Sequence, residues 1–495
     1  MSAELAVRTA HRLCPDTRRV ITRLFVPGEE TPEGRSRAKA VIARVLALTE
    51  AEVASSSEAI IASFRGRHRD LTGTFGRHFA VVAHEVPGHR RLSAERRMLI
   101  GACFTMEYAP EGAALFNPSM VAHPDQSGLA PGQLRFLMTV RSVGEGHLSS
   151  IGFRTGVLGP DGALTVADPE PLLTTAGPRP TAYQRNLFLG RLADLGDDHE
   201  LTQLLFGRLP EVFTAEELGD AVTAVHEHTL NRDRFQRMME HVRQIAAATY
   251  DVEFASDTAL TERLLWPASP SESHGMEDAR LVRFVDDDAT VTFYATYTAY
   301  DGAQVEPHLL ATRDFRRFHL SPMAGQAARN KGLALFPRRI GGRLQALSRW
   351  DRENIALVGS DDCNIWDKPT TLYAPTRAWE QIQVGNCGSP IETSDGWLVI
   401  THGVGPMRQY ALGAMLLDRT DPSVVRATLS TPLLVPNAAE RDGYVPNVVY
   451  SCGPLLHEEV LTIPYGISDG AIGFAQVALP ALLSQMDYRP RRGQG

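Results

Sequence analysis

Five stretches of this chain share one plan, and this internal repetition constrains its fold more than any other feature. Each stretch begins near a Gly or Asn, crosses a tight turn and reaches an apolar strand pattern that ends in polar residues. They occupy residues 114–154, 275–302, 332–354, 385–418 and 447–479. Short sheets of this kind cannot bury both faces alone, so we expect them to stack around a common axis. The repetition predicts a mainly β fold, a five-bladed β-propeller.

Two other segments have the sequence pattern of helices. In the first, Thr49 and Glu52 have the spacing of a capping box, and apolar residues follow at helical spacing. Thr214 and Glu217 repeat this arrangement in the second segment. We therefore predict a mostly helical N-terminal extension at 1–110, a first blade at 111–178, a helical insertion at 179–250, the remaining blades at 251–486 and a C-terminal tail at 487–495.

The apolar strands of the five units end in polar side chains. If the units stack around an axis, these strand ends meet in one central pocket, which is where a binding site is most often found. An isolated Arg or His at a strand end is usually a solvated edge group, but here the placement recurs in every unit. The residues concerned are Arg141, Tyr300, Asp301, Arg349, His402, Tyr465 and Asp469.

An acidic pair opens the second unit. Glu277 and Asp278 stand beside Arg280 at the start of a buried strand pattern. Carboxylates in such a place are unfavourable unless they are paired, so the cluster is either a structural ion pair or part of a site. The repeated polar strand ends favour a site.

Charge and composition exclude several classes of function. The net charge of −8 argues against nucleic-acid or anionic-membrane partners, which require basic surface. We expect no secretion signal and no transmembrane helix, because the start lacks an apolar region and no stretch of 18 uncharged apolar residues occurs. The five scattered cysteines indicate neither a disulfide framework nor a zinc site, which fits a reducing cytoplasm.

The remaining chemistry favours a sugar. The chain has no metal ligands at usable spacing, no Gly-rich loop leading into a helix and no nucleophile elbow. Carboxylates that face cations and aromatic rings suit glycosidic bond cleavage, in which an acid protonates the leaving oxygen and an oxygen nucleophile attacks from the opposite face.

Five ordered motifs resemble those of glycoside hydrolase family 130, the mannoside phosphorylases and related β-mannosidases. They read GMEDAR, KGLALFPRRIGGRLQALSR, GSPIETSDGWLVITHGV, YVPNVVY and PYGISD. The resemblance covers the strand-rich part, and the extension and insertion are additions to it. It implies a five-bladed propeller, the same number of blades as the repeat count.

The resemblance also implies roles for individual residues. Asp278 corresponds to the general acid, which acts through a sugar hydroxyl, and Ala279 stands where the family usually has Pro. Inorganic phosphate is the nucleophile, the configuration inverts, and no cofactor is required. The implied phosphate-binding residues are Lys331, Arg349, His402 and Tyr465. The implied substrate-binding residues are Asn117, Ser119, Arg141, Arg280 and Asp469.

The leading hypothesis is an inverting phosphorylase that converts short β-mannosides, its oligosaccharide partners, to mannose 1-phosphate. A working acid must stay protonated near neutrality, so we expect burial to raise the pKa of Asp278. Gln383 stands where the family has a third phosphate-binding Lys, which motivates an alternative, an inverting β-mannosidase that uses water. In that case Glu353 or Glu392 would be the base, although ion pairing is the simpler role for Glu392.

A third hypothesis, of another class, is a non-catalytic sugar-binding propeller. Replacement of Asp278 by Asn separates it from the two enzymes, because a binder keeps its ligand. Two roles are open for the extension and the insertion, namely narrowing the pocket mouth or building a homo-oligomer.

Overall fold

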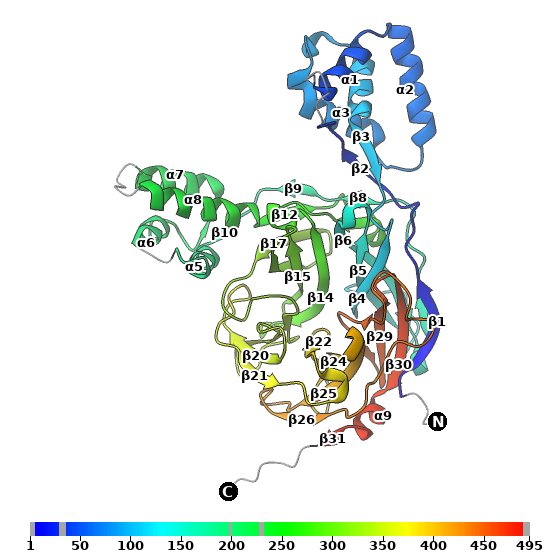
Figure 1. The fold of residues 1–495 in the computed structure, drawn as a ribbon, viewed down its shortest axis with the longest axis vertical. Helices are drawn as coiled ribbons and strands as arrows, with labels where there is room; N and C mark the ends of the chain where they lie inside the picture. Colours follow the sequence, from blue (N-terminus) through cyan, green and yellow to red (C-terminus); the bar gives the residue numbers. More distant parts are fainter. Residues whose placement is uncertain (1–4, 29–35, 198–199, 227–231, 489–495) are drawn as a thin grey trace.

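The protein is mainly β, with most of its helices gathered in two segments of the sequence (Figure 1). The computed structural model describes residues 5–28, 36–197, 200–226 and 232–488. Of the predicted C-terminal tail, residues 489–495 lie outside this description. Asp487–Tyr488 is a short strand, β31, that pairs with β26 (Val425–Thr428).

The first two repeat units belong to one sheet of twelve strands, where we had predicted separate blades. Ser149 pairs with Gly275, which joins the two units where the third strand of one meets the first strand of the next. Gly275 has a φ of 132°, and a Cβ at this position would lie 2.6 Å from the Ser149 nitrogen, so only glycine allows this approach. The strands of the first unit are β4 (Ala114–Ala122), β5 (Leu134–Val143), β6 (Ser149–Leu158) and β7 (Leu164–Val166); those of the second are β14 (Gly275–Val285), β15 (Val291–Tyr300), β16 (Val305–Thr312) and β17 (Arg317–Pro322). The others in this sheet are β8 (Thr174–Thr175), β9 (Gly177–Arg179), β12 (Tyr250–Glu253) and β13 (Arg263–Leu265).

The other three units each form a sheet of their own, with antiparallel neighbours. The third consists of β18 (Ala334–Leu335), β19 (Leu344–Ser348), β20 (Ile355–Ser360) and β21 (Thr370–Tyr373). The fourth contains β22 (Gln383–Asn386), β23 (Ile391–Glu392), β24 (Trp397–Val404) and β25 (Tyr410–Leu417), together with β26 and β31. The fifth contains β27 (Val449–Tyr450), β28 (Leu455–His457), β29 (Val460–Ile467) and β30 (Ala471–Ala478), together with β1 (Val7–Leu13).

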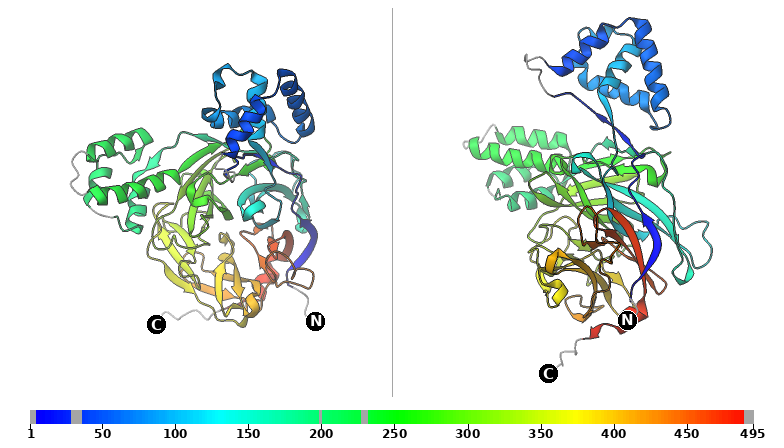
Figure 2. Two further views of the ribbon diagram at one scale, coloured as in Figure 1. Left: turned by 45° about the horizontal axis from the view of Figure 1, so that its top comes forward. Right: turned by 45° about the vertical axis from the view of Figure 1, so that its right-hand side comes forward.

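Apolar side chains pack each unit against the next. Separate buried clusters join the first unit to the second, the second to the third, the third to the fourth and the fourth to the fifth. A further cluster packs Ile472 and Phe474 of the fifth unit against Leu115 and Met138 of the first. Side-chain packing therefore connects the last unit back to the first, and Figure 2 shows the units following one another around a common centre.

The N-terminal strand β1 lies within the first 110 residues, which we predicted to be mostly helical. It pairs antiparallel with β30, with Val7 opposite Gln476 and Leu13 opposite Ile472. The pattern of these residues lacks the apolar spacing of a helix, and the strand gains its backbone partner from the other end of the sequence. Local sequence signals do not reveal such a partner.

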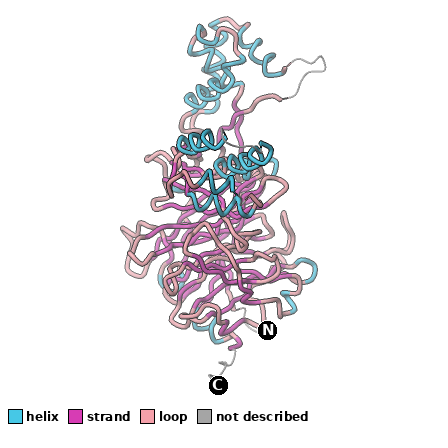
Figure 3. The backbone as a smooth tube through the Cα atoms, turned by 90° about the vertical axis from the view of Figure 1, so that its left-hand side faces the viewer, coloured by secondary structure: helices cyan, strands magenta, loops and turns pink. Residues whose placement is uncertain are grey.

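Four helices do form in the remainder of that segment, and they lie beyond one end of the strand-rich body (Figures 1 and 3). Thr49 and Glu52 make the predicted capping box, in which each residue bonds the backbone N–H of the other. The helices have a small core of their own. They are α1 (Arg37–Leu46), α2 (Glu50–Phe64), α3 (Leu71–Val82) and α4 (Ala94–Cys103), flanked by the paired strands β2 (Ile21–Leu24) and β3 (Thr105–Tyr108).

The second helical segment leaves the body and returns to it through two paired strands, β9 and β12. Thr214 and Glu217 again form a capping box at the start of α7. None of the helices in the described ranges is both long and apolar enough to cross a membrane. This segment contains α5 (Arg185–Asp194), α6 (Glu200–Phe206), α7 (Ala215–His226), α8 (Arg232–Ala247) and the paired strands β10 (Tyr183–Gln184) and β11 (Val212–Phe213); a short helix, α9 (Leu479–Ser484), follows β30.

A buried ion triad ties the chain before the first helices to the first unit. Glu111 accepts hydrogen bonds from Arg19 and from Arg154 in β6, and none of the three is more than 2% exposed. Arg19 also donates to the backbone carbonyls of Glu170 and Thr261. One carboxylate therefore fixes a guanidinium that holds three segments together.

Candidate active site

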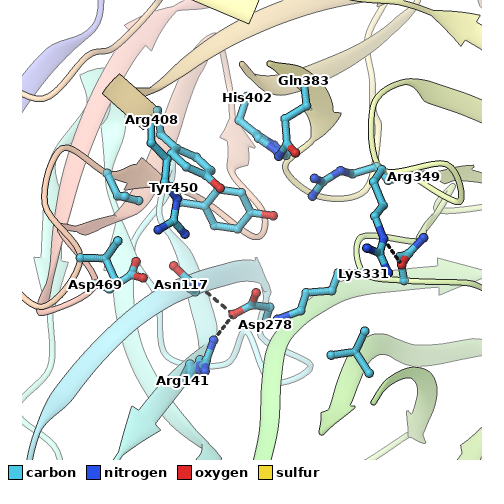
Figure 4. Close-up of a pocket in the computed structure, with 16 residues that line it drawn as sticks. Asn117, Arg141, Asp278, Lys331, Arg349, Gln383, His402, Arg408, Tyr450 and Asp469 are labelled. Atoms are coloured by element: carbon cyan, nitrogen blue, oxygen red, sulfur yellow. Dashed lines mark hydrogen bonds and ion pairs between the residues drawn. The ribbon is translucent and has the colours of Figure 1, made fainter. Parts of the chain in front are cut away.

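Polar side chains from different units surround a pocket of about 460 Å³ (Figure 4). Its lining comes from all five units, as expected if their strand ends converge. The predicted residues among the lining are Asn117, Arg141, Asp278, Lys331, Arg349, His402 and Asp469. The other lining residues are Val305, Asn330, Arg352, Gln383, Arg408, Tyr410, Val445, Val448 and Tyr450.

Two irregular strands aim Asp278 and Asn117 at each other. The pairing of β14 with β15 shifts register after Glu277, and that of β4 with β5 shifts after Phe116. Asp278 and Asn117 lie inside these shifts with φ values of 55° and 48°. The left-handed backbone, which Asn and Asp adopt more readily than most other residues, turns each side chain out of the strand's regular alternation. Asn117 Nδ2 donates to Asp278 Oδ1 at 2.7 Å.

Arg141 binds both members of the acidic pair. Its Nη1 lies 3.2 Å from Asp278 Oδ1, and its Nη2 lies 2.7 Å from Glu277 Oε1. The other oxygen of Glu277 accepts from Lys331 Nζ. Glu277 is 7% exposed and does not line the pocket, so it holds the two cations in place from behind.

The pKa of Asp278 moves opposite to our expectation. Burial raises it, but the charges of Arg141 and Lys331, the hydrogen bond from Asn117 and the charge of Arg280 together bring it below its usual value. The cations and the hydrogen-bond donor around the carboxylate lower its pKa by more than desolvation raises it. Asp278 is therefore ionised in the free protein at neutral pH.

Asp469 shows the reverse shift. Burial and the negative charge of Asp278 raise its pKa to about 6, although Arg141 and Arg408 act in the other direction. The pocket thus contains two carboxylates whose proton affinities are pushed apart, a pattern often found in sites that move protons.

Arg349 and His402 form the opposite wall with Gln383, whereas Lys331 reaches the side of Asp278. Figure 4 shows the Arg349 guanidinium directed toward His402 and Gln383. Arg349 Nε and His402 Nε2 are buried and have no hydrogen-bond partner among the described residues. Burial, with Arg349 and Arg280 nearby, lowers the pKa of His402 well below its usual value, so the ring is neutral. Unpartnered buried donors of this kind call for a ligand.

Five residues predicted to meet in the pocket do not line it, namely Ser119, Arg280, Tyr465, Tyr300 and Asp301. Ser119 is fully buried and its Oγ accepts from the Leu281 backbone N–H, which joins β4 to β14. Arg280 is 2% exposed and donates to the backbone carbonyls of Asn386 and Cys387 and to the Tyr450 hydroxyl. Tyr465 donates to Glu440 Oε1 at 2.6 Å. The first three side chains fix neighbouring backbone and lining residues and do not face the cavity.

The two glutamates considered as bases also lie outside the pocket lining. Glu392 forms ion pairs with Arg338 and Arg419. Glu353 is exposed at the surface. Among the described residues, no group of three or more His, Cys, Asp or Glu side chains is arranged to hold a metal ion.

Several lining residues escaped the sequence analysis. Tyr450 belongs to the YVPNVVY motif and Arg408 to the fourth unit, but neither stands at the end of a strand pattern. Arg408, Asn330 and Arg352 all lie in turns with positive φ. A polar residue at a tight turn between repeats is the signal that would have identified them.

Comparisons with known proteins agree with this geometry. A family model described as beta-1,4-mannooligosaccharide phosphorylase matches residues 240–488. A 1,2-beta-oligomannan phosphorylase of Thermoanaerobacter sp. (strain X514) is 34% identical over 208 residues, 41% of this chain and 68% of that protein. A beta-1,2-mannobiose phosphorylase of Listeria innocua is 29% identical over 234 residues, 46% of this chain and 64% of that protein.

A solved structure was also found. The structure of beta-1,2-mannobiose phosphorylase from Listeria innocua with beta-1,2-mannobiose aligns with a TM-score of 0.45 and 20% identity, covering 76% of this chain and 92% of that one.

Proposed function

Because the chain belongs to glycoside hydrolase family 130, we propose that its pocket catalyses the inverting phosphorolysis of short β-mannosides to mannose 1-phosphate. The observation that carries this proposal is the placement of Asp278, with Lys331 beside it, across one cavity from Arg349 and His402. An acid on one side and anion-binding donors on the other are the two requirements of glycosyl transfer to phosphate.

The mechanism follows from these positions. A phosphate dianion lies against Arg349, His402 and Lys331, and the mannosyl unit lies over Asn117 and Asp469. A phosphate oxygen bonds to the anomeric carbon as the glycosidic C–O bond breaks on the opposite face. The proton of Asp278 passes through a sugar hydroxyl to the leaving oxygen. The products are the shortened saccharide, mannose 1-phosphate and an ionised Asp278, which regains the phosphate ester's proton.

Phosphate also supplies the protonation that the free protein lacks. The cations that lower the pKa of Asp278 include Lys331 and Arg141. A bound dianion offsets their charge, so the pKa of Asp278 rises when phosphate binds. The general acid therefore takes up its proton more readily when the nucleophile is present, which disfavours transfer to water.

The repeats support a five-bladed propeller as the scaffold. The five apolar clusters join consecutive units, and the last unit packs on the first. The helices between β2 and β3 and those between β9 and β12 are additions to this ring.

A product assay tests the proposal. We expect β-1,2- or β-1,4-mannobiose to yield mannose 1-phosphate and mannose in equal amounts, and only when inorganic phosphate is present. The two products are measured separately by chromatography. Mannose released at the same rate without phosphate would make the protein a hydrolase, and no product from either sugar would support a binding protein.

Sugar binding is expected to weaken as the pH falls below about 6, the pKa of Asp469. The ionised carboxylate accepts two or more sugar hydroxyl bonds, whereas the protonated form has less acceptor capacity. The Kd for mannobiose, measured calorimetrically without phosphate, should rise by up to about tenfold per pH unit below this value. The charges that act on Asp469 are those of Asp278, Arg141, Arg408 and Glu277. Asp469→Asn should bind weakly at every pH, and the same inflection in that variant would contradict the assignment.

A further inference from the structure

Two turns, one with Asn330 and one with Arg352, meet at the side of the pocket that carries Arg349. Hydrogen bonds between these turns fix Arg352 there. Arg352 Nε donates to Asn330 Oδ1 at 2.8 Å, and Asn330 Nδ2 donates to the Trp350 carbonyl at 2.6 Å. The Arg352 N–H also bonds the Arg349 carbonyl at 3.0 Å. Asn330 and Arg352 have φ values of 61° and 72°. Such backbone is unfavourable for an arginine and persists only where surrounding bonds hold it.

Arg352 is a cation without a carboxylate partner among the described residues, and it lines the pocket. Lys331, by contrast, is already paired with Glu277. Of the two carboxylates adjacent in sequence, Asp351 accepts from the Glu353 and Asn354 backbone and from Asn354 Nδ2. With Nε bound to Asn330, the two terminal nitrogens of Arg352 remain for a ligand, and a guanidinium presents them as a planar fork.

Arg352 also lies next to Gln383, the uncharged residue on this side of the pocket. The Val384 N–H donates to the Glu353 carbonyl at 3.0 Å, which brings the backbone on either side of Gln383 and Arg352 together. Gln383 lines the pocket but carries no charge. The positive charge at this point of the wall therefore comes from residue 352 and not from residue 383.

We propose that Arg352 binds the phosphate co-substrate together with Arg349. This inference rests on the proposed phosphorolysis and adds the residue that supplies the unpaired charge. An exposed guanidinium at the pocket also attracts a dianion to a protein whose net charge is −8.

Replacing Arg352 separates phosphate recognition from sugar recognition. We expect Arg352→Gln to raise the KM for phosphate at least tenfold and to change the mannobiose KM less than twofold. Arg343→Gln is the matched control, because Arg343 belongs to the same repeat unit but pairs with Asp361 away from the pocket. A phosphate KM within twofold of the wild type, or a rise confined to the mannobiose KM, would overturn the inference.

A second variant tests whether the charge itself matters. Gln383→Lys placed in the Arg352→Gln protein returns a cation to the same part of the wall, and we expect it to restore most of the affinity for phosphate. A double variant as weak as the single one would assign the loss to the shape of the turn and refute the proposal.

A binding measurement keeps this inference distinct from the proposed function. Inorganic phosphate alone, without sugar, should raise the Tm of the wild-type and Arg343→Gln proteins but not of Arg352→Gln. If phosphate stabilises the wild type but not Arg352→Gln, and no mannose 1-phosphate is made, the proposed function is wrong. Phosphate binding by Arg352 is then still supported. If phosphate stabilises Arg352→Gln as much as the wild type, Arg352 does not bind phosphate, whatever products the enzyme makes.

Discussion

Replacement of Asp278 by Asn is expected to lower the rate of mannose 1-phosphate formation by about a thousandfold, or roughly 4 kcal/mol of transition-state stabilisation. The amide keeps the size of the side chain and its contact with Asn117, but it carries no transferable proton. Initial rates with mannobiose and saturating phosphate measure the change. Calorimetric binding of mannobiose should persist, since the sugar-facing residues are unchanged.

The matched control is Glu392→Gln, the same kind of substitution at a carboxylate that is paired with Arg338 outside the pocket. It should retain wild-type turnover. The pH profile provides an independent check, because phosphate raises the pKa of Asp278. The alkaline loss of activity should move to higher pH between low and saturating phosphate. An Asp278→Asn protein within tenfold of the wild type, or a profile that is flat with pH, would exclude Asp278 as the acid.

Replacement of Glu111 by Gln is expected to lower the free energy of unfolding by about 3–5 kcal/mol, because it leaves two buried guanidiniums without a counter-charge. Burial and the charge of Arg154 already lower the pKa of Arg19 to about 10, against the opposing effect of Glu111. Loss of the carboxylate also releases the contacts that Arg19 makes with the backbone at Glu170 and Thr261. Urea unfolding followed by tryptophan fluorescence measures the effect.

Glu58→Gln, an exposed position in α2, controls for the substitution itself and should stay within about 0.5 kcal/mol of the wild type. If Glu111→Gln were equally stable, the triad would make no net contribution.

The sequence located those parts of the pocket that follow a regular strand pattern. Arg141, Arg349 and His402 end apolar strands in equivalent units, so repetition alone predicted that they would meet. The alternation of side chains along a strand also explains why Ser119 and Arg280 were wrongly predicted to face the pocket. The register shifts after Phe116 and Glu277 change which side chains face the cavity, and therefore Ser119 and Arg280 lie on the buried side. Register shifts of this kind have no signal in a single sequence.

The direction in which the pKa of Asp278 shifts could not be predicted from the sequence, for a different reason. Its direction depends on the balance between desolvation and three cations from separate units, and only their placement decides the sign. Arg352 and Arg408 were missed because both lie in turns with positive φ, where the strand pattern gives no indication of direction.

The pairing of β1 with β30 has a consequence for how the protein folds during synthesis. Leu13 pairs with Ile472, about 460 residues later in the sequence. At ribosomal rates of about 5–20 residues per second, β1 waits roughly 25–90 s for its partner strand. Contacts so distant in sequence also slow folding once the chain is complete. Arg8, His11 and Arg12 lie within β1, and charged side chains of this kind discourage an unpaired strand from joining other nascent chains.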